Sequence, residues 1–162
     1  MKETDVDILI ACDLNPSRPW FRDRIPAIKD VIQNHKAKIL IKDIYELLNP
    51  TDGYNPSDSK KRREFFQTAD LIKINLNIVE NILKIKPKNF LLGTVDNYIE
   101  FLLPSTIRLI QDKGIFVAGI LGDDELRINI NKYFLPLFDL SIVYVKNIQM
   151  LYQSFQNKPV YY

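Results

Sequence analysis

Short, almost uninterrupted apolar runs are the feature that most restricts how this chain can fold. Each run has the length of a β-strand, and polar residues do not alternate regularly with apolar ones inside it. The runs are VDILIAC (residues 6–12), AKILI (37–41), NFLLGTV (89–95), GIFVAGIL (114–121) and FDLSIVYV (138–145), and KPVYY (158–162) begins a sixth. Because a strand with one wet face alternates apolar and polar side chains, this pattern predicts strands that are covered on both faces.

Helices are predicted between these runs. In residues 22–35 and 69–86, apolar side chains recur at spacings of three and four, which places them on one helix face. Residues 103–114, with Pro104 near the start and Gly114 at the end, and residues 146–157 supply two more helices. The alternation predicts a Rossmann-like α/β fold, a doubly wound and mostly parallel sheet of five to six strands between helix layers. Residues 1–162 are expected to form a single domain.

Composition argues against several classes of function. The formal net charge is +2, whereas nucleic-acid binding requires a concentrated basic surface. The one basic cluster, KKRR at residues 60–63, is interpreted as the solvated start of a helix. The single histidine, His35, argues against a histidine-rich metal site and a Ser-His-Asp triad. Cys12, the single cysteine, lies in an apolar run and is expected to be a small buried hydrophobe.

The N-terminus and the apolar runs bear on localisation. The chain opens with MKETDVD, which has acids where a signal peptide needs positive charge, and the apolar run that follows is too short to span a bilayer. We therefore expect a soluble, cytoplasmic protein with no membrane span.

Carboxylates follow four of the first five predicted strands. They are Asp13, Asp43, Asp96 and Asp123. In open parallel sheets, ligands bind outside the carboxyl ends of the strands, so these acids are expected to converge on one edge. A single strand-end acid is often only a helix cap. The convergence of several is what predicts a site.

The doublet Asp123-Asp124 has two interpretations. The sequence GDDE before LRININKYF resembles a helix start, and Asp124 could bond the free amides there. Asp123 would then be left for a ligand hydroxyl or for Arg127, because two adjacent carboxylates repel each other unless one meets a partner. The pair offers no third ligand at helical spacing, so no metal is expected.

The loop after the first run, DLNPSRPW, is the other dense stretch. Asn15 and Arg18 offer polar groups and Trp20 a flat apolar face, a combination that suits sugars and nucleotides. Trp20 could equally pack the first helix against the sheet. The chain contains neither a G-x-G-x-x-G dinucleotide motif nor a P-loop. Candidate substrate-binding residues are therefore Asp13, Asn15, Arg18, Trp20, Asp124 and Arg127.

The second half of the chain carries a series of short motifs. A predicted helix is followed by Lys-Pro and a strand, and the next helix ends in Lys-Gly. The strand after it ends in Gly-Asp-Asp, and Phe-Asp begins the following strand. A helix with an aromatic residue then precedes the final strand. These parts are Lys86-Pro87, Lys113-Gly114, residues 122–124, Phe138-Asp139, Tyr152 and residues 160–162. In this order they resemble the N-terminal half of GT-B glycosyltransferases, most closely the bacterial spore-maturation-type group.

The resemblance implies an acceptor-side domain that works without a metal or other cofactor, with a second domain that binds the nucleotide-sugar donor. In an inverting enzyme of this kind, a carboxylate such as Asp123 or Asp96 would deprotonate the acceptor hydroxyl. The first loop departs from the glycine-rich turn common in this fold, so its contacts are not carried over. The chain ends where the second domain would begin, so it is expected to be inactive without a C-terminal domain or a partner chain.

Two other functions remain open. One is a flavodoxin-like or receiver-like binding or regulatory module, with acids at strand ends and Lys146 after the fifth run. Receivers, however, place their paired acids after the first strand, whereas this doublet follows the fourth. The other is an interaction domain that pairs with a second copy through the aromatic VYY end, because an unpaired strand edge invites association.

Overall fold

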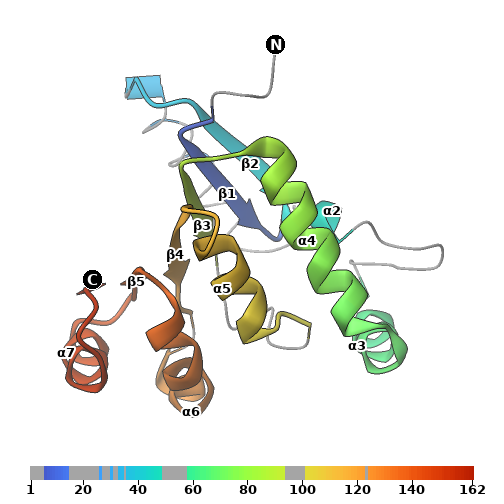
Figure 1. Ribbon diagram of the computed structural model, residues 1–162. Coiled ribbons are helices and arrows are strands. Elements are labelled where there is room, and N and C mark those ends of the chain that lie inside the picture. Colours follow the sequence, from blue (N-terminus) through green and yellow to red (C-terminus); the bar gives the residue numbers. More distant parts are fainter. Residues whose placement is uncertain are drawn as a thin grey trace.

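The part of the chain that the structure describes forms one sheet of six parallel strands. The computed structural model describes residues 6–14, 36–48, 58–93, 101–122 and 124–162, with isolated positions between 26 and 34. The described strands lie in the order β2-β1-β3-β4-β5-β6, and every neighbouring pair is parallel (Figure 1). They are β1 (Ile8–Cys12), β2 (Ile39–Asp43), β3 (Asn89–Leu92), β4 (Phe116–Ile120), β5 (Leu140–Ile142) and β6 (Val160–Tyr161). Each predicted apolar run overlaps one of these strands, which confirms the Rossmann-like α/β fold.

Helices connect β2 to β3 and every later pair of strands, as predicted. The elements are α2 (Ile44–Leu47), α3 (Ser59–Thr68), α4 (Leu71–Ile85), α5 (Pro104–Gln111), α6 (Asp124–Phe134), the 3₁₀ turn η2 (Leu135–Leu137) and α7 (Lys146–Phe155). The helices expected in residues 69–86, 103–114 and 146–157 are confirmed as α4, α5 and α7. The helix expected in residues 22–35 lies outside the described residues, apart from a few isolated positions.

Apolar side chains are buried on both faces of the sheet. After β2, every crossover runs in the same direction along the sheet, and right-handed crossovers then place α4, α5, α6 and α7 on one face (Figure 1). The main core lies beneath these helices and includes Leu9, Ile78 and Val117. A smaller cluster around Ile10 and Cys12 lies on the opposite face of β1. This explains why polar residues do not alternate along the runs.

Helix α4 shows how the sequence produces these layers. It begins where the Asp70 carboxylate accepts a hydrogen bond from the Lys73 amide (3.0 Å), and it ends at Lys86, whose φ of 53° is left-handed. Ile74, Ile78 and Ile82 are buried on its inner face. Burying each such side chain contributes about 1.5–3 kcal/mol relative to leaving it exposed, which holds the helix on the sheet.

Asn75 joins α4 to the start of α5. Its amide nitrogen donates to the Phe101 carbonyl (2.7 Å), and its oxygen accepts from the Leu103 amide (3.0 Å) and the Thr106 hydroxyl (2.5 Å). Helix α5 has no side-chain cap of its own at Leu103, so Asn75 binds an amide that the helix leaves unsatisfied.

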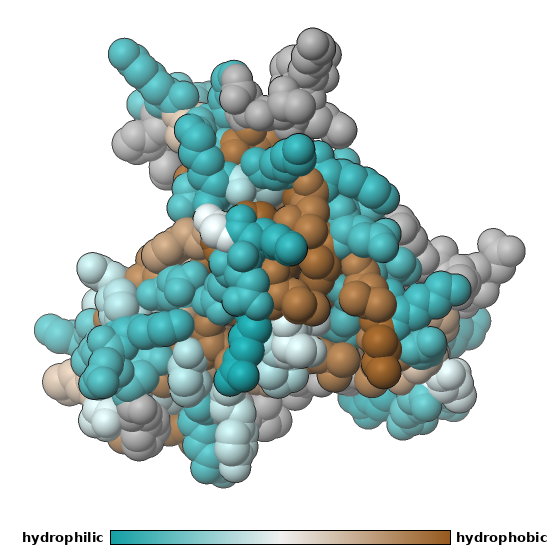
Figure 2. All heavy atoms as spheres, viewed as in Figure 1, coloured by the Kyte–Doolittle hydropathy of each residue, from teal (hydrophilic) through white to brown (hydrophobic). Residues whose placement is uncertain are grey.

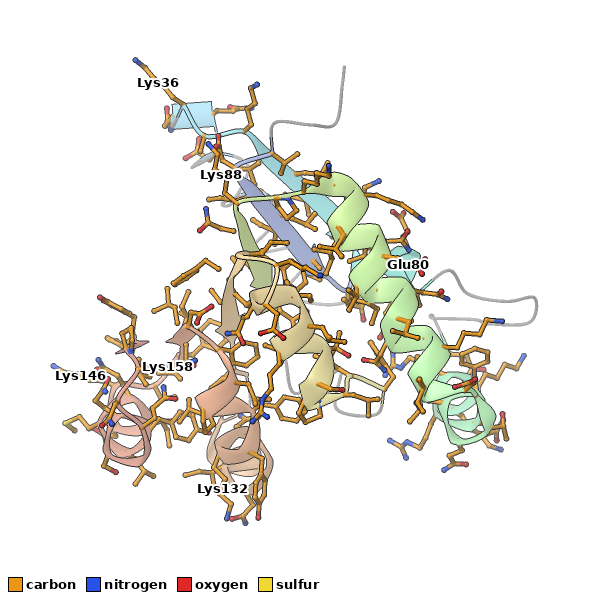
Figure 3. The ribbon with its side chains drawn as sticks, in the orientation of Figure 1. Lys36, Glu80, Lys88, Lys132, Lys146 and Lys158 are labelled. Atoms are coloured by element: carbon orange, nitrogen blue, oxygen red, sulfur yellow. The ribbon has the colours of Figure 1, made fainter. Side chains whose placement is uncertain are left out.

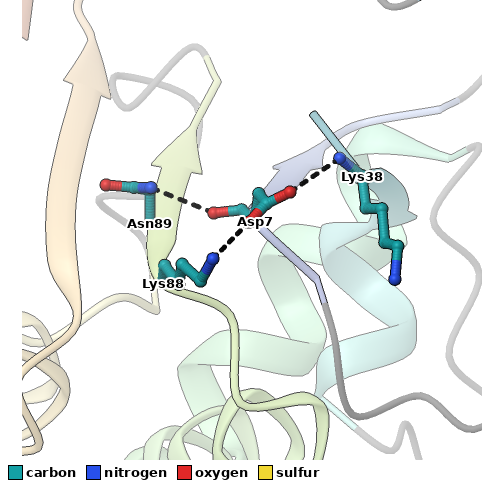
Figure 4. Close-up of polar contacts among 4 residues, drawn as sticks. All are labelled: Asp7, Lys38, Lys88 and Asn89. Atoms are coloured by element: carbon teal, nitrogen blue, oxygen red, sulfur yellow. Dashed lines mark hydrogen bonds and ion pairs between the residues drawn. The ribbon is translucent and has the colours of Figure 1, made fainter. Parts of the chain in front are cut away.

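Asp7 ties together the starts of three strands at the amino edge of the sheet (Figure 4). Its carboxylate accepts hydrogen bonds from the Lys38 amide (2.9 Å) and the Lys88 ammonium (2.7 Å), and its carbonyl accepts from Asn89 (3.0 Å). The hydrogen bond from Lys88 is the main reason that the pKa of Asp7 is lowered. These bonds fix the register in which β2 and β3 flank β1.

The basic cluster at residues 60–63 begins α3, as expected. Lys60 and Lys61 are exposed, and their backbone amides donate to the Asp58 carboxylate. Arg62 differs from the expected solvated arrangement. Its guanidinium lies 5.9 Å from the centre of the Tyr45 ring, and its Nε and one Nη are buried. Helical geometry turns this one member of the cluster toward α2.

Candidate functional site at the carboxyl edge of the sheet

The connections that follow β1 and β3 run in opposite directions along the sheet. The chain crosses from β1 to β2 on one side, whereas β3 lies on the other side of β1. In open α/β sheets, this change of direction separates the loops at the carboxyl ends of the two strands and creates a place for a ligand. The residues that follow β1 and β3, with those that follow β2 and β4, therefore form the candidate site.

Asp13 and Asp43 approach each other at this edge. Cys12 at the end of β1 pairs with Asp43 at the end of β2, and Asp13 follows Cys12 directly. Asp13 is only 3% exposed. Asp43 is half-buried, and burial raises its pKa. A hydrogen bond from the Tyr45 amide (3.0 Å) opposes that rise, and the negative charge of Asp13 adds to it.

The two carboxylates have different environments. Asp43 already caps α2 through Tyr45, so part of its hydrogen-bonding capacity serves the fold. Because burial and the negative charge of Asp13 raise its pKa, Asp43 keeps its proton to higher pH than an exposed aspartate. The protonated carboxyl group can both donate a hydrogen bond to a ligand hydroxyl and accept one from it. Asp13 and Asp43 together could therefore bind an uncharged polar ligand.

The end of β3 comes very close to the end of β1. The Gly93 amide donates to the Ala11 carbonyl (2.9 Å), and a Cβ at Gly93 would lie 3.1 Å from the Cβ of Cys12. Cys12 is fully buried, and burial raises the pKa of its thiol to about 12. This confirms Cys12 as a buried hydrophobe. Gly93, which follows β3, therefore lies against the end of β1, one residue before Asp13.

The end of β4 is tied to the helix that follows it. The side chain of Asn131 in α6 is completely buried, and its amide nitrogen donates to the Gly122 carbonyl (3.1 Å). Helix α6 begins at Asp124, so Asp124 and Arg127 both lie in its first turn. The helix predicted after the GDDE sequence is confirmed, and its first turn lies at the carboxyl edge.

The predicted site residues fall into three groups. Asp13 lies at the carboxyl edge, as expected. Asp124 and Arg127 are placed by their backbone at the start of α6, and their side chains lie outside the described residues. The remaining predicted residues also lie outside them, and they are Asn15, Arg18, Trp20, Asp96 and Asp123.

Two residues of this edge were absent from the predicted site. Asp43 was recognised as a strand-end acid but not as the neighbour of Asp13, which parallel pairing of the first two strands would have indicated. Asn131 gave no such signal. It lies nine residues beyond Gly122 in a polar helix, and only the fold turns it toward the strand end.

Comparisons with known proteins find no match to any family model, any curated protein or any solved structure. Within the described residues, no helix is long and apolar enough to cross a membrane. The same residues contain no group of three histidine, cysteine or acidic side chains arranged to hold a metal ion.

Proposed function

We propose that this chain forms the acceptor-binding domain of a GT-B glycosyltransferase, with the acceptor at the carboxyl edge of β1 to β4. The observation that carries the proposal is the approach of Asp13 to Asp43 beside the β1–β3 switch point. Carboxylates that accept hydrogen bonds from hydroxyls are suited to sugars, and this edge is where such a fold binds ligands.

The positions of the glycosyltransferase-like motifs support the proposal. Lys86 and Pro87 lie between α4 and β3, and Lys113 and Gly114 lie between α5 and β4. Phe138 and Asp139 precede β5, and the aromatic Tyr152 is buried on α7. The Lys-Pro, Lys-Gly and Phe-Asp motifs thus lie between a helix and a strand, and Tyr152 lies within a helix, an arrangement compatible with the proposed family order.

The proposed chemistry is deprotonation of the acceptor hydroxyl by a carboxylate. Asp123 or Asp96 would be the base, and Asp13 with Asp43 would orient the hydroxyls of the acceptor. A useful base needs a pKa near the working pH, and burial beside a second acid raises a carboxyl pKa in that direction, as at Asp43. The donor nucleotide sugar would bind to a second domain or to a partner chain.

Titration of the isotope-labelled chain with saccharides tests this proposal. We expect mono- and disaccharides to shift the amide NMR signals of Asp13, Asp43, Gly93 and Gly122, and Asp13→Asn to weaken the binding. Asp112→Asn, at the exposed end of α5, is the matched control. The absence of saccharide-induced shifts at this edge, or equal binding by Asp13→Asn, would contradict the proposal. Joined to a donor domain, Asp123→Asn and Asp124→Asn would then test the base.

The strand order favours a second candidate, a flavodoxin-like or receiver-like module. One strand lies beyond β1, as in the flavodoxin-like order 2-1-3-4-5, whereas the dinucleotide-binding order 3-2-1-4-5-6 places two there. Against phosphoryl transfer, Lys146 at the start of α7 points away from β1 (Figure 3). Incubation with acetyl phosphate followed by mass spectrometry separates the two candidates. A phosphorylated Asp96 would favour the receiver, and an unmodified chain would exclude it.

A further inference from the structure

Helix α4 exposes large apolar side chains beside the face that it buries against the core. Ile72 is 69% exposed, Leu76 is 49% exposed, and Leu83 is partly buried. With Val79 beneath them, these residues follow one another at spacings of four, three and four, which forms a single stripe along the helix. Figure 2 shows apolar surface along α4 on the viewed face of the molecule.

Helix α5 forms the second wall of a groove beside this stripe. The hydrogen bond between Asn75 and Thr106 shows which side of α5 faces α4. Leu109 lies three residues after Thr106, so it follows on that side, and it is 42% exposed. Leu109 therefore adds to the apolar surface that Ile72 and Leu76 begin, and the two helices present one apolar groove.

The groove ends in a pocket at the amino edge of the sheet. The pocket has a volume of about 510 Å³ and is lined by Leu83, Lys86, Pro87, Lys113, Gly114 and Ile115. Leu83 belongs to both the stripe and the pocket, so the two surfaces are continuous. The pocket lies at the opposite end of the strands from Asp13 and Asp43, which makes it independent of the proposed acceptor site.

Two lysines give this end of the groove a positive charge. Lys86 and Lys113 are exposed, and within the described residues neither forms an ion pair with a carboxylate. Lys73 and Lys84 on α4 and Arg108 on α5 add three more positive charges. The exposed negative charges on the two helices are Glu80, labelled in Figure 3, and Asp112 at the end of α5, so the positive charges predominate. An occupant of the groove should therefore be apolar along its length and acidic at its edges.

We propose that the α4–α5 groove binds an amphipathic, acidic helix of a partner protein. From Ile72 to Leu83 the stripe spans about 17 Å at 1.5 Å per residue, the length of three helical turns. The four-three-four spacing is the heptad spacing at which one helix packs into another. Acidic side chains of the partner helix pair with Lys86 and Lys113. A second copy of this chain fits less well, because α4 against α4 would bring lysines together.

Two peptide probes test this inference. Each is a fluorescein-labelled helix of about 18 residues with leucine at the two core heptad positions. One carries glutamate and the other carries lysine at the flanking positions. Fluorescence anisotropy with the full chain at low salt should show saturable binding of the glutamate peptide and at least about tenfold weaker binding of the lysine peptide.

Matched variants locate the binding surface. Leu76→Glu should weaken binding of the glutamate peptide about tenfold or more, whereas Met150→Glu on α7, where Met150 is 61% exposed, should leave it unchanged. The double variant Lys86→Glu and Lys113→Glu should reverse the preference toward the lysine peptide, whereas Lys132→Glu should not. Circular dichroism confirms that each variant is folded.

Three results would overturn the inference. They are equal binding of both peptides, the absence of saturable binding, and unchanged binding by Leu76→Glu. A fourth contradicting result could come from light scattering. If the chain is dimeric and Leu76→Glu makes it monomeric, the groove belongs to a second copy and not to a partner helix.

Discussion

Replacement of Asn75 by alanine should destabilise the fold far more than the small number of atoms removed suggests. Asn75 is buried, and its side chain bonds the Phe101 carbonyl, the Leu103 amide and the Thr106 hydroxyl. Alanine would leave these three groups without that partner at the α4–α5 junction. Each unsatisfied buried group costs about 1–3 kcal/mol, and water entering the vacated space recovers part of it. We expect the free energy of unfolding to fall by about 3–5 kcal/mol.

Asn77→Ala is the matched control. Asn77 lies on the same helix, is partly buried, and donates one hydrogen bond, to the Leu48 carbonyl (3.1 Å). Its loss should cost about 1 kcal/mol. Thr106→Val removes one of the Asn75 bonds, so combined with Asn75→Ala it completes a double-mutant cycle that isolates their coupling.

Urea unfolding followed by circular dichroism measures these differences. The variants should shift the unfolding midpoint and leave the slope of the transition unchanged, because the same surface is exposed on unfolding. If Asn75→Ala were no more destabilising than Asn77→Ala, the three tertiary bonds would not stabilise the junction. Strict additivity of Asn75→Ala and Thr106→Val would likewise contradict their direct contact.

Four further outcomes follow from the packing and the charges. Gly119→Ala should cost about 2 kcal/mol or more, because its Cβ would lie 2.7 Å from the Phe138 ring; Phe138→Leu should recover part of the loss, and a neutral Gly119→Ala would refute the close contact. Cys12 is fully buried, and a rise in its pKa from 9.0 to about 12 lowers the thiolate fraction about a thousandfold, so at pH 8 it should react with Ellman's reagent only as fast as the chain unfolds. Rapid reaction of the folded chain would contradict its burial. Asp13→Asn should lower the pKa of Asp43 in carbon-13 NMR titrations, because the negative charge of Asp13 helps to raise it. Since that pKa is raised in the folded state, the stability of the fold decreases as pH rises through it, and the variant should make this decrease smaller. An unchanged Asp43 pKa would show that the two acids do not interact. The pKa of Asp7 is lowered, so the stability that its carboxylate contributes is present above the ordinary value of 3.8 and is lost as pH falls through the lowered pKa. In urea unfolding at several pH values, Lys88→Met should weaken this pH dependence and Lys84→Met should not, and equal effects would refute the Lys88 bond.

The strands were predictable because their signal is local. A run buried on both faces stays apolar throughout, so each predicted run overlaps a strand of the sheet, although β2 extends to Asp43, two residues beyond its run. The ends of the strands were less predictable. Residues 114–121 were predicted as one strand, but Gly114 adopts a left-handed φ of 77° and β4 begins at Phe116. In the same way, β5 covers only Leu140–Ile142 of a longer apolar run, because it pairs with the last three residues of β4 and β4 ends at Ile120.

The candidate site was predictable only in outline. The sequence has an acid after each of several predicted strands, and parallel strands are expected to bring such acids to one edge. The described residues show this for Asp13 and Asp43. It does not indicate which acids become neighbours. The short helix α2 was also missed, because four residues are too few to show a helical period, and with it the capping role of Asp43 was missed.

Sequence alone determined the alternation of strands and helices, the burial of Cys12 and the sheet edge at which Asp13 and Asp43 lie, because each depends on the order of apolar and polar residues along a short segment. Tertiary structure decided that β1 lies between β2 and β3, which makes Asp13 the neighbour of Asp43. It also decided that Asn75 closes the start of α5 and that α4 and α5 pack side by side with exposed apolar side chains on both. Those features depend on contacts between segments that are distant in the chain, and such contacts form only when the segments pack on a common sheet.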